Sequence, residues 1–529
     1  MQGEMKMESI MTQATSAALH DGVGPGEGTH SPCPCFERPA RFANASYCQL
    51  AARAHRMRGK WAFTLFLVAS LGLGALAARA AEAPVCELYA TGHFGNWYEV
   101  AGVNEMRQML SEARQWGYNC YADWFDATDC VDPFSGNPQY SLGNALWDLK
   151  RVHFRTAQSL GFATDLVIAP NHVYRDQLKP EWLAKRGPRI QGQLICPHQP
   201  GARAAILRNY TNLFADLAKA GVKLTAINAC PYDYGGCACD QCKPWILTFA
   251  QLTLDIHKIA LTYHPKVELH FIGWWWTPEE HKLFAQWMDE HAPGVAVSMA
   301  LHIPYDKTSV ADVPLPKGCR KYAFVHIGYP DRATPRDIYG KTGPVVAPKR
   351  LDDTVRDLQA QSVTGVMAYS EGIYDDLNKA LLGGLFTGRQ KTSREVLEAY
   401  ARRYFAADSA QARRWADWLA PWGAPYSVDA SAARKALAIL SGAPTSWRRR
   451  QWELKADMFA ANQAIGTGDN WTPERLARAD EFWAAEETLQ REVYGIGPLR
   501  HILNRRFIEM PWYKSWASQK PPSAPLPEQ

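Results

Sequence analysis

The sequence predicts an α/β fold, a (β/α)8 TIM barrel followed by a C-terminal α-helical domain. Eight short apolar runs recur between residues 85 and 371, and amphipathic helical patterns separate most of them. Strands that alternate with helices pair in parallel through right-handed crossovers. No G-x-G-x-x-G turn follows any run, so an open dinucleotide-binding sheet is disfavoured. After about Lys391 only helical patterns continue, which predicts the second domain.

Each expected strand is a short run of apolar, aromatic or β-branched residues. The eight runs are residues 85–90, 119–125, 163–170, 223–230, 266–273, 295–303, 321–329 and 363–371. Helical patterns follow every run except the sixth, where the linkage around residues 306–319 is expected to hold little or no helix. Eight such units in roughly 300 residues are typical of a closed barrel.

The N-terminal region is expected to lie outside the folded domains. Residues 57–80 begin with basic side chains, continue as an apolar run and end in Ala-Arg-Ala, the layout of a secretory signal cut after Ala80. An uncleaved anchor is the alternative, because the run is nearly long enough to cross a bilayer. Residues 1–56 show no periodicity and are expected to be disordered or an over-extended translation start. We therefore expect a secreted or periplasmic protein without stable membrane insertion after signal cleavage.

The remaining chain divides by pattern and composition. We expect a catalytic barrel over residues 81–390, a helical domain over 391–515 and a Pro-rich tail over 516–529. The net charge of +5 is small and spread along the chain, so no nucleic-acid partner is expected. Twenty tryptophans are unusual, and exposed indole rings suit stacking on the apolar faces of sugars. The sequence does not indicate an oligomeric state.

Functional side chains of a barrel come from the carboxyl ends of its strands and from the loops that follow. Several predicted strands end in acids, amides, imidazoles or aromatic rings, which together suit a carbohydrate. The residues expected to bind such a substrate are Asp123, Asn171, His172, Asn228, Trp274, Trp275, Trp276, His302 and Tyr369.

Asp233 and Glu371 are the expected catalytic pair. Glycosidic bond cleavage generally needs two carboxylic groups that flank the bond. Asp233 follows the fourth run in a turn with two glycines, and Glu371 ends the eighth run, where partial burial would raise its pKa. The purely structural alternatives are a turn residue for Asp233 and an ion pair with Lys379 for Glu371.

Two motifs carry a resemblance to a known group of enzymes. Asp233-Tyr-Gly-Gly-Cys-x-Cys-x-x-Cys and Tyr369-Ser-Glu-Gly-Ile-Tyr-Asp-Asp-Leu-Asn-Lys resemble secreted bacterial glycoside-hydrolase-like barrels, similar to the broad superfamily of β-hexosaminidases and α-glucuronidases. The resemblance covers about residues 85–405 and implies a barrel with a helical C-terminal part, retaining or inverting glycan hydrolysis, and no organic cofactor. Hexosaminidases that use the acetamido group of the substrate place two acids side by side after strand four. Here Asp233 lies between Tyr232 and Tyr234, which disfavours that mechanism.

Nine cysteines follow the expected cleavage point, and four of them are close in sequence: Cys230, Cys237, Cys239 and Cys242. Four thiolates satisfy a tetrahedral structural zinc, whereas an oxidising compartment permits two disulfides, and the spacing leaves both open. Either would brace the loop that carries Asp233.

Two other functions remain open from the sequence. One is a non-catalytic glycan-binding barrel, and the other is a metal-dependent hydrolase, for example a polysaccharide deacetylase, with a His and carboxylate metal site at the rim.

Overall fold

The computed structural model describes most of the chain after residue 83, and these residues belong to one compact unit, residues 83–529. The segments expected as a disordered start, a signal peptide and a Pro-rich tail lie outside the described residues, as do Asp233 and Glu371. The described residues are 84–92, 97–99, 101–136, 141–187, 194–231, 235–303, 310–328, 346–370, 372, 374–405, 407–422, 429–439, 447–465 and 472–493.

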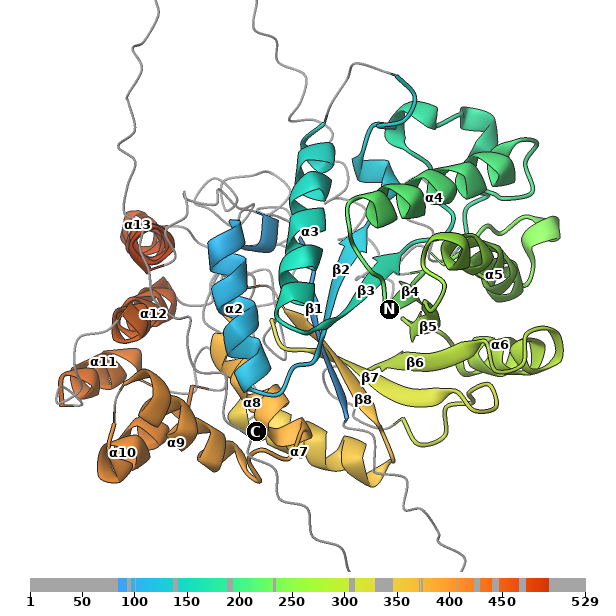
Figure 1. Ribbon diagram of the computed structural model, residues 1–529. Helices are drawn as coiled ribbons and strands as arrows, with labels where there is room; N and C mark the ends of the chain where they lie inside the picture. The colour runs from blue at the N-terminus through green and yellow to red at the C-terminus, as the bar shows by residue number, and fades with distance from the viewer. Residues whose placement is uncertain are drawn as a thin grey trace, which may run out of the picture. The chain divides into compact units, whose positions relative to one another are not determined.

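Eight parallel strands close into a barrel in the order of the sequence (Figure 1). Strand β8 pairs with β1 to close the ring, with Tyr89 in register with Tyr369. The barrel and the helices that follow it confirm the predicted fold class. The strands are β1 Val85–Ala90, β2 Cys120–Phe125, β3 Ala163–Ile168, β4 Ala226–Ala229, β5 Glu268–Gly273, β6 Ala296–His302, β7 Arg320–His326 and β8 Gly365–Ser370.

Helices connect the strands and cover the outside of the barrel. Two of them, α3 and α6, begin with capping boxes, in which Ser141 and Thr277 accept hydrogen bonds from the first helical turn. Between β6 and β7 the described residues 303 and 310–319 hold no helix, as the sequence predicted. The helices are α2 Val103–Gln115, α3 Leu142–Ser159, α4 Ala202–Lys219, α5 Trp245–Tyr263, α6 Pro278–His291, α7 Pro348–Ala360 and α8 Asp376–Phe386.

Short 3-10 helices occupy several of the loops. They are η1 Trp97–Glu99, η2 Ala127–Asp129, η3 Arg175–Gln177, η4 Pro180–Trp182 and η6 Asp240–Cys242. Among the described residues no helix is long and apolar enough to span a membrane.

Both faces of each strand are buried, and successive side chains of a strand point to opposite faces. One face of each strand packs under the helices in the large core, which includes Leu88, Leu166 and Phe271. The other face points into the barrel and forms a separate cluster that includes Tyr89, Trp124, Phe324 and Tyr369. The interior is therefore filled by side chains, and a functional surface is expected at the carboxyl end of the barrel.

A helical region follows the barrel. Its helices are α9 Ser393–Tyr404, α10 Ser409–Leu419, α11 Ala430–Ile439, α12 Trp447–Ile465 and α13 Pro473–Thr488, followed by the π-helical turn η7 Leu489–Val493. Tryptophans join these helices: Trp418 packs against Trp415, Trp422 and Trp452 at ring-centroid distances of 4.7–5.9 Å.

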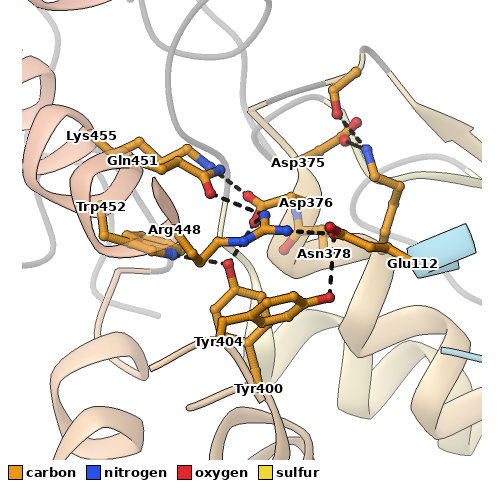
Figure 2. A network of polar contacts seen from close by, with 12 residues as sticks. Glu112, Asp375, Asp376, Asn378, Tyr400, Tyr404, Arg448, Gln451, Trp452 and Lys455 are labelled. Carbon is orange, nitrogen blue, oxygen red and sulfur yellow. Dashed lines mark hydrogen bonds and ion pairs between the residues drawn. The ribbon is translucent and has the colours of Figure 1, made fainter. Parts of the chain in front are cut away.

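A buried network of charges joins the helical region to the barrel (Figure 2). Asp376, the first residue of α8, accepts hydrogen bonds from Arg448 (2.7 Å) and Tyr400 (2.6 Å) and pairs with Lys455. Arg448 also pairs with Glu112 on α2. Burial alone would raise the pKa of Asp376, but the charges of Lys455 and Arg448 hold it below its usual value. The network therefore fixes α12 against the first and last helices of the barrel, and Figure 1 shows α9–α13 beside α2 and α8.

Candidate active site

Aromatic and imidazole side chains gather at the carboxyl ends of strands β5–β8. The ring centroid of Trp274 lies 4.1 Å from that of His302 and 5.5 Å from that of His326. His326 in turn lies 5.0 Å from Tyr369. We call Trp274, His302, His326 and Tyr369 the mouth cluster. It rests on the rings of Tyr89 and Phe324 inside the barrel.

The two histidines of the mouth cluster have lowered pKa values. Burial lowers the pKa of His302 to about 4. Burial, together with the charges of His302 and Arg350, holds the pKa of His326 well below its usual value. Both rings are therefore neutral near pH 7 and offer one donor and one acceptor each, rather than a positive charge.

The tryptophan triplet after β5 divides between three environments. Trp275 is 45 % exposed and stacks on Trp274, with ring centroids 5.7 Å apart and an interplanar angle of 19°. Its φ of 53° lies in the left-handed region, which sends the three side chains in different directions. Trp276 is buried and packs against Phe249 and Phe284 under the helices. The substrate contacts of Trp274 and Trp275 stay predictions, which their placement at the mouth favours, whereas the placement of Trp276 does not favour such a contact.

An aspartate–histidine pair follows strands β2 and β3. His172 Nδ1 lies 2.8 Å from Asp126 Oδ1, and both side chains are buried. Asp126 also accepts hydrogen bonds from the backbone N–H and the hydroxyl of Thr128. Burial alone would raise the pKa of Asp126, but His172 and Thr128 lower it. The ionised carboxylate therefore orients the ring of the predicted substrate-binding residue His172.

Two other predicted substrate residues are engaged in structural contacts. Asp123 lies on the outer face of β2, where it pairs with Lys150 at 3.1 Å and accepts a hydrogen bond from the Gly92 backbone. Asn171 exchanges backbone and side-chain hydrogen bonds with Ile195 in the loop between β3 and α4. Their roles in substrate binding stay predictions, and the placement of Asp123 does not favour one.

Asn228 lies inside the barrel, in a polar layer on the amino-terminal side of the mouth cluster. Its Nδ2 donates a hydrogen bond to Glu87 at 3.3 Å. Burial and the nearby charge of Asp165 raise the pKa of Glu87 well above its usual value. Asp165 in turn lies 3.8 Å from the ring of His270. The depth of this layer separates Asn228 from the rim, so its placement does not favour the predicted substrate contact.

The cysteines gather in a different set from the predicted one. Cys237, Cys239 and Cys242 converge with Cys196, and their four Sγ atoms lie within 4.8 Å of one another. Cys230 instead packs inside the barrel with Val167 and Ile272. The alternation Ala226, Asn228, Cys230 along β4 signals this inward position. Cys196 lies 34 residues before Cys230, and only the adjacency of the loops after β3 and β4 brings it into the group.

The two predicted catalytic residues come after strands on opposite sides of the barrel. Asp233 follows β4 and Glu371 follows β8, and these strands lie opposite each other, four places apart in the ring. Lys379, the alternative partner considered for Glu371, pairs with Asp375 at 2.5 Å and also contacts Ser370. Asp375 stands at the N-cap of α8 without making a side-chain capping bond.

A surface hollow lies at the other end of the barrel. It has a volume of about 560 Å³ and is lined by residues before and within β3 and before β4, including Phe162, Thr164, Lys223 and Thr225. Because it faces the amino ends of the strands, it is separate from the mouth cluster, and barrel chemistry is expected at the opposite end.

Comparison with known proteins finds only weak similarity to solved structures. No protein-family model and no curated protein sequence matches the chain. Similar solved structures include the β-amylase catalytic domain of Paenibacillus polymyxa (TM-score 0.38, 9 % identity, 57 % of this chain and 97 % of that one). A β-mannanase from the blue mussel Mytilus edulis has a TM-score of 0.37 and 10 % identity over 57 % of this chain and 92 % of that one.

A third neighbour is α-L-fucosidase isoenzyme 2 from Paenibacillus thiaminolyticus (TM-score 0.38, 11 % identity, 61 % of this chain and 51 % of that one). The chain thus matches about half the length of the fucosidase. These neighbours are glycoside hydrolases with barrel folds. At such TM-scores they carry no functional argument, and the fold is established here by the closed ring of eight parallel strands. Fold and site together define a (β/α)8 barrel with an aromatic mouth.

Proposed function

We propose that the chain is a secreted glycoside hydrolase that binds a carbohydrate at the carboxyl end of its barrel. The observation that carries this proposal is the mouth cluster with Trp275 stacked on its edge. The exposed indole of Trp275, stacked on the half-buried indole of Trp274, offers a flat apolar surface to a sugar ring. Neutral histidines and a tyrosine beside it supply hydrogen-bond donors and acceptors for hydroxyl groups.

Asp233 and Glu371 are the proposed catalytic carboxyl groups. One would protonate the leaving oxygen, and the other would act as nucleophile or as the base that activates water. The strands that precede them lie on opposite sides of the ring, so a sugar chain across the mouth would pass between the loops that carry them. His172, held by Asp126, is proposed to position a hydroxyl group of the substrate.

The first test is activity of the purified protein against aryl glycosides and plant, algal and host glycans. Asp233→Asn and Glu371→Gln are each expected to lower kcat by about 10²–10⁴, the usual contribution of acid–base catalysis. Asp240→Asn is the matched control, because Asp240 lies in the same loop with an exposed side chain paired only to Lys243 among the described contacts. Unchanged activity in both test variants would refute the assignment of the pair.

The same assay separates the other functions. Glycan binding without turnover would indicate a non-catalytic barrel. Activity that survives both substitutions but is lost to a chelator would indicate a metal-dependent hydrolase. Among the described residues, the groups of side chains that could hold a metal are the four cysteines and the buried set Glu87, Cys120 and Asp165. Neither group contains a histidine.

A further inference from the structure

The loops after β3 and β4 are joined by the four cysteines Cys196, Cys237, Cys239 and Cys242, which we call the thiol cluster. Cys196 comes from the loop between β3 and α4, and the other three come from the loop between β4 and α5. Three of the four side chains are almost completely buried, with exposed fractions of 0–3 %. Four thiols from two loops thus converge on one point beneath the surface.

The distances within the thiol cluster suit a central tetrahedral ion. Cys196 Sγ lies 3.8 Å from Cys239 Sγ and 3.7 Å from Cys242 Sγ. Sulfurs bound to zinc at about 2.3 Å lie about 3.8 Å apart along the edges of a regular tetrahedron. All four sulfurs lie within 4.8 Å of one another, so each can reach the same ion.

Disulfides fit the same cluster less well. Cys196 is nearly equidistant from Cys239 and Cys242, which singles out neither as the covalent partner. No described cysteine forms a disulfide in the structure. Cys237 and Cys239 are separated by a single residue, a spacing at which the two sulfurs bond each other poorly.

Backbone hydrogen bonds hold the two loops of the thiol cluster together. The N–H of Lys185 donates to Cys237 Sγ at 3.3 Å, and the N–H of Ala238 donates to the Lys185 carbonyl at 3.0 Å. Cys239 and Cys242 flank the 3-10 turn η6, in which the Cys242 N–H donates to the Cys239 carbonyl. A C-x2-C turn of this kind presents two sulfurs on one side, the arrangement found in structural zinc sites.

We propose that the thiol cluster binds one structural zinc ion through Cys196, Cys237, Cys239 and Cys242. Four sulfur ligands leave no open position for water, so the ion joins two loops and takes no part in chemistry. One of these loops begins with Asn171 and His172, and the other contains Asp233. The effect on the active site rests on the proposed function. If that function holds, the zinc-bound thiol cluster would fix the two loops that carry the proposed catalytic and substrate-binding residues.

Metal analysis of the purified full chain tests the site without measuring activity. We expect about one zinc per chain and, from X-ray absorption at the zinc edge, four sulfur ligands at about 2.3 Å. Cys196→Ser is expected to lose most of the zinc. Cys230→Ser is the matched control, because it replaces another buried cysteine near the same strand ends and should retain the ion.

The outcomes that contradict the proposal are distinct. Alkylation and mass analysis that find these four cysteines oxidised would establish disulfides in place of zinc. Iron in place of zinc, or a coordination shell with nitrogen or oxygen ligands, would also refute it. Loss of zinc in Cys230→Ser with retention in Cys196→Ser would refute the ligand set. If Cys196→Ser does not fold, the absorption spectrum of the unmodified protein still decides. None of these results depends on glycoside hydrolysis, so the proposed function fails or survives separately.

Discussion

Trp275 shows how a single backbone conformation shapes the candidate site. Its left-handed φ turns one indole toward solvent between a neighbour that enters the mouth cluster and another that enters the core. The sequence predicted an aromatic triplet after strand five, but nothing in three identical residues indicates which ring is exposed. The difference arises from the turn that ends β5, and only the structure shows it.

Replacing Trp275 is expected to separate binding from stability. Because the ring is 45 % exposed, Trp275→Ala should change the free energy of unfolding by about 0.5 kcal/mol or less. Loss of the stacking surface should raise KM or the glycan Kd about tenfold, which corresponds to about 1.4 kcal/mol. Glycan binding by calorimetry and unfolding by urea measure the two effects. Leu261→Ala, an exposed apolar residue on α5, serves as the control. Unaltered glycan binding in Trp275→Ala would remove this residue from the site.

Glu486 on α13 makes stability depend on pH. Its side chain is buried and accepts a hydrogen bond from Tyr374 at 2.9 Å, and burial raises its pKa to about 8. The neutral acid is favoured in the folded state, so its contribution is complete below the ordinary pKa of about 4.5. That contribution is lost as the pH rises from there through about 8, by at most about 1.4 kcal/mol per pH unit.

Glu486→Gln is expected to remove this dependence, because the amide stays neutral at every pH. Urea unfolding at about pH 5 and about pH 8 should give a smaller difference for the variant than for the unmodified protein. Glu481→Gln is the control, because Glu481 is exposed on the same helix and pairs with Arg478. Equal pH dependence in Glu486→Gln and the unmodified protein would contradict the assignment.

At the scale of elements, Asp376 joins three helices, α8, α9 and α12. It begins α8 and contacts Tyr400 of α9 and Arg448 and Lys455 of α12. The side chains of Arg448 and Lys455 are 3 % and 0 % exposed, so both cations depend on protein partners. The sequence could not reveal that basic residues more than 70 positions later lie beside Asp376.

Asp376→Asn is expected to destabilise the protein by about 3–5 kcal/mol, because it removes the carboxylate paired with buried Lys455 and leaves Glu112 as the described carboxylate partner of buried Arg448. Thermal and urea unfolding measure the loss. Asp353→Asn is the matched control, since Asp353 pairs with Lys349 and Arg356 on the surface of α7 and should matter by about 0.5 kcal/mol or less. Similar effects of the two substitutions would show that the buried network contributes little.

The strands were the best-predicted elements, because each is a compact apolar run between polar segments. The run 85–90 coincides with β1, and the other predicted strands overlap the observed ones with ends displaced by up to three residues. The ends differ because an apolar pattern alone does not mark the residue at which hydrogen bonding between strands stops. The thiol cluster was predicted in part. Three of its cysteines are close in sequence and were expected together, whereas including Cys196 requires knowing which loops meet.

At the scale of the whole molecule, the site combines residues from the full length of the barrel. Tyr89 of β1 packs against Tyr369 of β8, although 280 residues separate them. The count of eight strands predicted that the first and last strands lie side by side. In a closed parallel barrel the carboxyl ends of all strands also meet at one rim. It could not predict which aromatic rings fill the mouth or which pair with histidines, because those contacts depend on packing across the barrel.

The contacts of Arg448 with both Glu112 and Asp376 have a consequence for the order of assembly. These partners belong to the first and last covering helices, on either side of the junction between β1 and β8. A chain still shorter than 448 residues can form every strand, yet it lacks the cation that bridges this seam. Before that point, β1 and β8 are held by their own pairing and by contacts such as the hydrogen bond between Tyr98 and Ser370, and a strand edge that is still unpaired favours association with other chains. We therefore expect the C-terminal helices to stabilise the closed ring only after β1 and β8, which are far apart in the sequence, have paired.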